Sequence, residues 1–324
     1  MSVTTSPSSS SLFKFAVDDC DVEDDKALGA YRDKRHEWLE WLEGDPRNSI
    51  NRQIRGMMWD DAAFRALNEA RRFSSPEYPT GATAPLLAGL IDQGFVATQI
   101  LSITRLVDRR QDVISLRRLL DDIEAHAHLI TREIFVCHDG LPFDPVEAER
   151  AYWEREGPPI SGGVIGLPTE GPDAFDISRM AHEAFDKVSA TGSGPRSRTD
   201  CIESGVFSSL RAALATPDIV AILQLRHKFV AHAADAASRG RAGIERFGVT
   251  LNQLEAGQRA LVQTAQRIEL DLLWGTTRGV VPVPQYDHFI HLDIPVVATD
   301  RMGELGEWWR AHCDTREAWT RSPS

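Results

Sequence analysis

Apolar residues return every three or four positions through most of this 324-residue chain. This is the spacing that lines one face of an α-helix. The segments with this pattern are 25–43, 49–72, 85–110, 115–136, 145–156, 176–189, 199–215, 218–239 and 251–274. Long helices joined by short connections pack against their sequence neighbours. The pattern therefore predicts an all-α fold built as an antiparallel helical bundle.

The helical pattern is expected to fill residues 25–275, interrupted by a loop-rich insert near 138–175 that is rich in Pro and Gly. Residues 1–24 are rich first in Ser and then in acidic side chains, which is typical of a disordered, mobile tail. We see no internal repeat. One helical domain with a flexible N-terminal tail is the expected organisation.

The C-terminal extension, 276–324, has a different character. The stretches 280–284 and 293–297 favour extended backbone, which makes the extension irregular. A last helix carries Trp308 and Trp309, and we expect it to pack back on the body.

Charge and cysteine content narrow the class of protein. A net charge of −12 argues against broad binding to nucleic acid, which depends on neutralising phosphates. The four cysteines are scattered with no C-x-x-C pair, which favours a reducing compartment over a disulfide framework or a thiolate zinc site. No apolar run reaches the roughly 18 residues of a membrane span, and no secretory signal opens the chain. We therefore expect a cytoplasmic protein without a membrane partner.

Basic residues nevertheless gather in two regions. The clusters are Arg105, Arg109, Arg110, Arg117 and Arg118, and Arg196, Arg198, Arg211, Arg226, Lys228, Arg239, Arg241 and Arg246. Such clusters either hold a particular RNA in a cleft or form solvated helix faces. The sequence leaves both interpretations open.

One segment of the predicted 218–239 helix places Arg226, His227, Lys228 and His232 on an otherwise apolar background. Arginine offers a fixed, forked cation for phosphate, and histidine can accept or donate a proton near neutral pH. On an ideal helix Arg226 and His232 differ by roughly 240° around the axis. Both side chains can meet at one phosphate only if the helix kinks or a second copy of it faces the first. This geometry favours a homodimer.

The segment Arg226-His-Lys-Phe-Val-Ala-His232 resembles the Arg-x(4–6)-His motif of the HEPN superfamily. Upstream, Gln99-Ile-Leu-Ser-Ile-Thr-Arg-Leu-Val-Asp108 and Ser115-Leu-Arg-Arg-Leu-Leu120 are similar to the abortive-infection Abi-U-like branch of that superfamily. The resemblance covers roughly residues 50–275.

Membership of that superfamily would imply an all-α bundle, a dimer and, in many members, a metal-independent ribonuclease without cofactors. His232 would then be the acid/base, and Arg226 would stabilise charge on the phosphate, with Lys228 or His227 assisting. The common form of the motif has a polar residue, often Asn, after the arginine, where this chain has His227. Many such proteins are toxins or phage-defence effectors with an antitoxin or defence-system partner, and others have lost activity.

Arg105 and Asp108 are i,i+3 neighbours within the apolar 85–110 segment. We interpret them as a buried structural ion pair that supports the motif helix. A catalytic role for Asp108 is the alternative.

Other candidate sites carry weaker signals. His126 and His128 lie on different faces of a helix, and Cys137-His138 offers only two ligands. The alternating Asp287-His288-x-x-His291-x-Asp293 could chelate a metal on extended backbone, but lacks a matching ligand cluster. Neither Cys137 nor Cys201 has a nucleophile signature, and Ser161-Gly-Gly163 lacks the Gly-Lys-Ser/Thr of a phosphate loop.

The sequence thus leads to two hypotheses. The first is a metal-independent endoribonuclease acting on RNA, with tRNA among the candidate substrates, in a toxin–antitoxin or phage-defence (abortive infection) setting. The second is a non-catalytic helical scaffold or dimeric interaction module. A metalloenzyme at His288 and His291 ranks third.

Overall fold

The computed structural model describes residues 12–73, 85–157, 172–189, 195–230, 235–241, 248–275, 279–280, 286–287, 289–290, 292, 294 and 298–318. These residues are predominantly helical and form no β-strand. Isolated bridges join Thr131 to Cys201 and Ser189 to Ile202. The prediction of an all-α fold is confirmed.

The helices follow the predicted segments, with shifted ends. The α-helices are α1 (Asp25–Leu39), α2 (Ile50–Phe73), α3 (Pro85–Leu106), α4 (Leu116–Ala125), α5 (Arg132–Cys137), α6 (Pro145–Glu156), α7 (Pro172–Asp186), α8 (Ser204–Ala213), α9 (Pro217–Leu225), α10 (Ala236–Arg241), α11 (Leu251–Arg267) and α12 (Met302–Ala318). Short 3-10 turns are η2 (Val17–Asp19), η5 (Ala127–Leu129) and η8 (Thr299–Arg301). Three α-helices, α1, α9 and α11, end in the wider π-helical turns η3 (Glu40–Gly44), η6 (Arg226–Val230) and η7 (Ile268–Leu272).

The predicted helix over 115–136 is wrong as a single element, because it divides into α4, η5 and α5. Thr131 adopts extended backbone and pairs with Cys201. The backbone amide of Arg132 donates to the carbonyl of Asp200 at 2.8 Å, in place of a helical bond within its own segment. Contacts with residues 200–201, which are distant in the sequence, therefore interrupt the 115–136 segment, although its apolar spacing is continuous.

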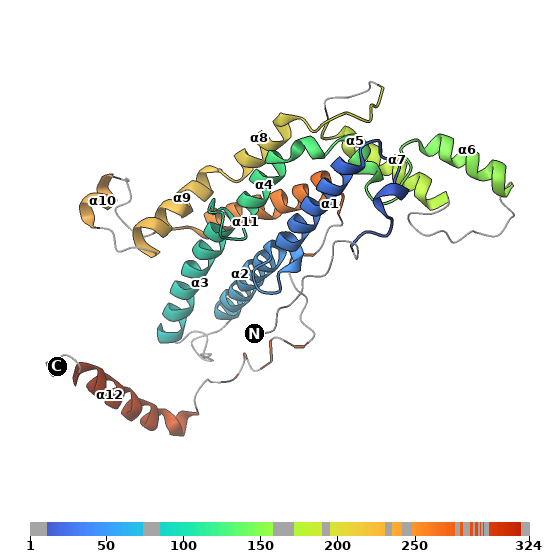
Figure 1. The fold of residues 1–324 in the computed structure, drawn as a ribbon. Coiled ribbons are helices and arrows are strands. Elements are labelled where there is room, and N and C mark those ends of the chain that lie inside the picture. Colours follow the sequence, from blue (N-terminus) through green and yellow to red (C-terminus); the bar gives the residue numbers. More distant parts are fainter. Residues whose placement is uncertain are drawn as a thin grey trace, which may run out of the picture. The chain divides into compact units, whose positions relative to one another are not determined.

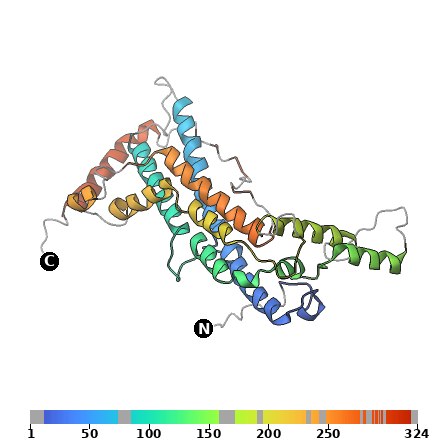
Figure 2. The same ribbon diagram turned by 90° about the horizontal axis from the view of Figure 1, so that it is seen from above.

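The chain divides into two units, Met1–Trp59 with Val96–Pro282, and Asp60–Phe95 with Val283–Ser324. In the first unit α11 lies alongside α8 and α9, and α4 packs on α8 (Figure 1, Figure 2). At its other end α7 lies beside both α5 and α6. A buried amide chain crosses this core, because Gln258 donates to Gln99 at 2.9 Å and Gln99 donates to the Met57 carbonyl at 3.0 Å.

The second unit has little buried surface. Phe64 of α2 stacks on Phe95 of α3 with ring centroids 3.7 Å apart, and Arg71 pairs with Asp92 at 2.7 Å. In α12, Trp308 and Trp309 are 57% and 52% exposed. The packing of this helix on the body stays a prediction. The segments 280–284 and 293–297 lie almost entirely outside the described residues.

Helix α3 is buried over its second half only, where Ile100, Ile103 and Leu106 are fully enclosed. Leu86 and Leu90 in its first half are 75% and 68% exposed, so the apolar composition of the 85–110 segment does not mean burial along its whole length. Within the described chain, α3 is the single helix whose length and apolar composition would suit a membrane span, and the bent pair of α8 with α9–η6 passes the same test jointly. Core helices of soluble proteins also have this composition, so the signal is weak.

Residues 12–24 do not behave as part of a mobile tail, contrary to the prediction. The Asp139 carboxylate accepts hydrogen bonds from the amides of Lys14 and Phe15 at 2.8 and 3.0 Å. Asp21 accepts from the Phe143 amide at 2.8 Å. These long-range bonds hold the segment against the turn that follows α5.

Candidate functional site

The motif helix α9 begins with a strong local start signal. Thr216 caps it by accepting from the Ile219 amide, and Pro217 occupies the first turn, where a missing N–H costs nothing. Ile219 and Ile222 are fully buried. A Cβ added at Gly257 of α11 would lie 3.3 Å from Ile222, so the two helices pack closely at this point.

At Arg226 the backbone changes from α-helical to the π-helical turn η6, which ends at Val230. Isolated π-turns cost stability and are frequent at functional sites. A π-turn advances fewer degrees per residue than an α-helix, so the ideal-helix angle between Arg226 and His232 does not apply. His232 itself lies in 231–234, outside the described residues.

The guanidinium of Arg226 is half-buried and lacks a carboxylate partner among the residues that the structure describes. Its Nε is buried and has no hydrogen-bond acceptor there. Some other arginines of the second basic cluster do pair with carboxylates: Arg196 pairs with Asp186 at 2.7 Å, and Arg211 pairs with Glu124. Since a half-buried cation is costly without a counter-charge, Arg226 is suited to receive an anion.

The side chains next to Arg226 lie close to α10. Lys228 donates from Nζ to the Ser238 hydroxyl at 2.9 Å, and the Arg239 guanidinium lies 5.7 Å from the centroid of the Phe229 ring. His227 is exposed. Arg226, Lys228 and His227 therefore sit on one short turn, with the cations of α10 beside it. Nothing in the sequence signals the contact with Ser238.

The predicted buried ion pair between Arg105 and Asp108 is wrong. α3 ends at Leu106, so the i,i+3 helical geometry does not reach Asp108, and Arg105 is exposed. Asp108 instead accepts from the backbone amide of Arg110 at 3.0 Å and pairs with the Arg110 side chain at 3.3 Å. It serves as a turn residue between α3 and α4, because its carbonyl also accepts from the Ser115 hydroxyl at 2.6 Å.

No group of three or more His, Cys, Asp or Glu side chains suited to a metal ion occurs in the described part of the chain. His126 uses Nδ1 against the Asp122 carbonyl at 2.8 Å, and its ring lies 6.3 Å from that of His128. His288, His291 and Asp293 lie outside the described residues. Burial raises the pKa of the Cys137 thiol far above its usual range, which makes it a poor nucleophile.

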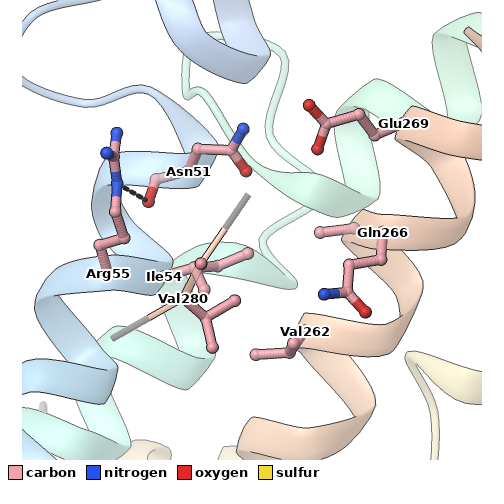
Figure 3. Close-up of a pocket in the computed structure, with 9 residues that line it drawn as sticks. Asn51, Ile54, Arg55, Val262, Gln266, Glu269 and Val280 are labelled. Carbon is pink, nitrogen blue, oxygen red and sulfur yellow. Dashed lines mark hydrogen bonds between the residues drawn. The ribbon is translucent and has the colours of Figure 1, made fainter. Parts of the chain in front are cut away.

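A small cavity of about 20 Å³ lies between α2 and α11. Figure 3 shows Asn51 and Arg55 on one side and Gln266 and Glu269 on the other. The volume is sufficient for a single water molecule. It cannot admit a substrate.

Comparisons with protein-family models, curated proteins and solved structures find no match. Any assignment of chemistry to the motif therefore depends on its own side chains. The relevant facts are a half-buried arginine at a π-turn with no carboxylate partner among the described residues, a lysine two residues later and an exposed histidine between them.

Proposed function

We propose that this chain is a HEPN-type, metal-independent endoribonuclease whose site is centred on Arg226 and His232. The observation that carries the proposal is the environment of Arg226. Its half-buried guanidinium has no counter-charge within the described residues, although the chain carries 48 acidic residues. A phosphate would supply that charge, and a planar guanidinium can bind two of its oxygens at once.

The chemistry requires one proton acceptor, one cation and no metal. The 2′-hydroxyl loses its proton to a base and attacks the adjacent phosphorus, and the bond to the 5′-oxygen breaks. The products are a 2′,3′-cyclic phosphate and a 5′-hydroxyl, which takes up a proton. We assign His232 as acid/base, Arg226 as the group that stabilises the additional negative charge on the phosphate, and Lys228 or His227 as assistants.

The wider setting is part of the same proposal. The resemblance to HEPN proteins implies a bundle of their type, a homodimer, and a role as a toxin or phage-defence effector in the cytoplasm. The all-α character of the chain agrees with such a bundle. RNA, with tRNA as the first class to test, is the proposed substrate, and an antitoxin or defence protein is the proposed partner.

Purified protein tests the enzyme directly. Wild-type protein is incubated with total RNA and with tRNA in the presence of EDTA, beside His232→Ala and the matched control His128→Ala. His128 is an exposed histidine outside the motif. We expect cleavage by the wild type and the control and none by His232→Ala. Cleavage that persists in His232→Ala, or that EDTA abolishes, would contradict the assignment.

One observation favours a second function, a non-catalytic interaction module. Apolar side chains on α3 and α12 are exposed, and exposed apolar faces mark sites for partners. They are Leu86, Leu90, Met302, Leu305, Trp308 and Trp309. If no RNA is cleaved and His232→Ala converts a dimer into a monomer, the motif holds the dimer together. The hypothesis of a non-catalytic interaction module would then be correct.

A further inference from the structure

The short helix α10 lies near the end of α9 (Figure 1), and a side-chain hydrogen bond joins it to the motif turn η6. Lys228 of η6 donates to Ser238 of α10 at 2.9 Å, and Arg239 of α10 lies over the Phe229 ring at 5.7 Å. These two contacts place α10, the helix that carries Arg239 and Arg241, next to the turn that carries Arg226. We call Arg226, Lys228, Phe229, Arg239 and Arg241 the η6–α10 patch.

The patch is strongly basic in a chain of net charge −12. Residues 226–241 contain four Lys and Arg and a single acidic residue, Asp235. The Asp235 carboxylate is engaged at the start of α10, where it accepts from the Ser238 amide at 2.6 Å. The positive charge of this surface is therefore opposed by little negative charge of its own segment.

Several arginines elsewhere in the chain pair with carboxylates. Arg198 pairs with Asp21 at 2.7 Å and Arg117 with Asp121 at 2.9 Å. Arg118 instead lies over the Trp41 ring at 4.0 Å. These members of the predicted basic clusters are therefore held in internal pairs and stacks. In the η6–α10 patch, Arg239 instead lies over the half-buried ring of Phe229.

Cations combined with an aromatic ring match single-stranded nucleic acid. Its phosphates attract Lys and Arg, and its unstacked bases can lie on an aromatic face. Bases in a duplex are already stacked and offer no face to Phe229. We propose that the η6–α10 patch binds a single-stranded stretch of RNA, with Arg239 and Arg241 on phosphates beside the scissile one and Phe229 against a base. The choice of RNA rests on the proposed function.

Binding can be measured separately from cleavage. The probe is a short, unstructured, fluorescently labelled RNA, added to full-length His232→Ala protein and followed by anisotropy over a range of salt concentrations. The test variant adds Arg239→Ala and Arg241→Ala. The matched control adds Arg52→Ala and Arg109→Ala, which remove the same charge from exposed positions outside the patch.

We expect the patch variant to bind roughly tenfold more weakly at low salt. The plot of the logarithm of the association constant against the logarithm of the salt concentration should become less steep by about 1.4, because two phosphate contacts are lost and each contributes about 0.7 to the slope. Phe229→Leu should weaken binding roughly tenfold without changing the slope, since stacking carries no charge. The control should bind as the parent does. Far-UV circular dichroism and thermal unfolding verify that each variant is folded, and Arg241→Ala alone gives a milder test at an exposed side chain.

Two results would contradict RNA binding by the patch: no binding by the His232→Ala parent protein, or equal affinities for the patch and control variants.

The experiment also separates this proposal from the proposed nuclease activity. If wild-type protein cleaves RNA but the patch variants bind normally, the patch is wrong and the nuclease stands. If RNA binds through the patch but wild-type protein never cleaves it, the surface is right and the enzyme is wrong.

Discussion

The guanidinium of Arg132 is fully buried in the first unit and joins three parts of the chain. It pairs with Asp186 of α7 and with Asp200, each at 2.7 Å, and it lies over the Phe185 ring at 4.9 Å. It also donates to the carbonyl of His182 at 3.2 Å. A charge so enclosed is tolerated only because its donors are satisfied.

Arg132→Met should therefore lower the free energy of unfolding by about 3 kcal/mol, because it leaves the two carboxylates without their shared cation. Urea denaturation followed by circular dichroism measures the change. Arg179→Met is the matched control, since Arg179 also meets two carboxylates, Glu149 and Asp176, but is 36% exposed. It should cost under about 1 kcal/mol. Equal losses would show that Arg132 is no more buried than Arg179 in solution.

His138 gives the protein a predictable response to acid. Burial, reinforced by the charge of Arg35, lowers the pKa of His138 from 6.5 to about 3. The neutral ring must donate from Nδ1 to the carbonyl of Phe135, 3.0 Å away, because a carbonyl only accepts. The unfolded chain therefore binds a proton that the folded chain does not, between these two pKa values.

The sign follows from this difference in bound protons. The contribution of His138 to the free energy of unfolding is complete above pH 6.5, and it is lost as the pH falls toward 3. His138→Phe removes the titration and fits a ring already surrounded by Tyr31 and Phe13. Between pH 6 and 4, the wild type should lose about 1.4 kcal/mol per pH unit more than the variant in urea titrations. Parallel pH profiles for the two proteins would refute a buried, neutral His138.

At the scale of helices, apolar periodicity was sufficient to locate most elements. α6 has the predicted bounds, and α2 differs from its prediction by one residue at each end. Local signals such as Pro145 and the cap of Asp144 are sufficient to start α6. The all-α fold class follows from this information alone.

What the sequence could not predict depends on residues distant along the chain. The break before Arg132 follows from the amide bond to Asp200, and the attachment of residues 12–24 follows from Asp139 and Arg32. The pairing of Arg105 with Asp108 failed for a local reason, because the helix stops at Leu106 and frees Asp108 for a turn. In the candidate site, the residue types are recognisable from the sequence. The π-turn at Arg226, and the lack of an acceptor for its Nε within the described part of the chain, are visible only in the structure.

The close approach of α11 to α9 makes a prediction at this scale. A Cβ at Gly257 would lie 3.3 Å from both Ile103 and Ile222, whereas nothing lies within 4 Å of a Cβ at Gly56 of α2. Gly257→Leu should destabilise by about 1–3 kcal/mol through overpacking. Gly56→Leu, at an exposed helical site, should instead stabilise by roughly 0.5–1 kcal/mol.

Thermal and urea unfolding of both leucine variants give the comparison. Because α9 leads directly into Arg226, Gly257→Leu should also weaken RNA binding, while Gly56→Leu should not. A stabilising effect of leucine at both positions would show that α11 and α9 are not in close contact.

At the scale of the whole molecule, burial separates Trp38 from the two tryptophans of α12. Trp38 is fully buried and donates from Nε1 to Asp122 at 2.7 Å, whereas Trp308 and Trp309 on α12 are more than half exposed. On α12 these rings share an apolar stripe with Met302 and Leu305 at helical spacing, and its polar face is acidic rather than basic. An acidic face disfavours anionic lipid surfaces, so the interaction module proposed above would use this stripe for a protein partner.

This division predicts opposite outcomes for the same chemical change. Trp308→Ser with Trp309→Ser should alter the free energy of unfolding by under about 0.5 kcal/mol, because little buried area is removed. Trp38→Ser should cost about 3–5 kcal/mol, since it opens a cavity and leaves the Asp122 carboxylate without its indole donor. Urea denaturation monitored in the far ultraviolet compares the three proteins without relying on the substituted fluorophores. If the double variant loses more than 1 kcal/mol, α12 packs on folded chain in solution. Its apolar stripe would then serve stability and not recruitment of a partner.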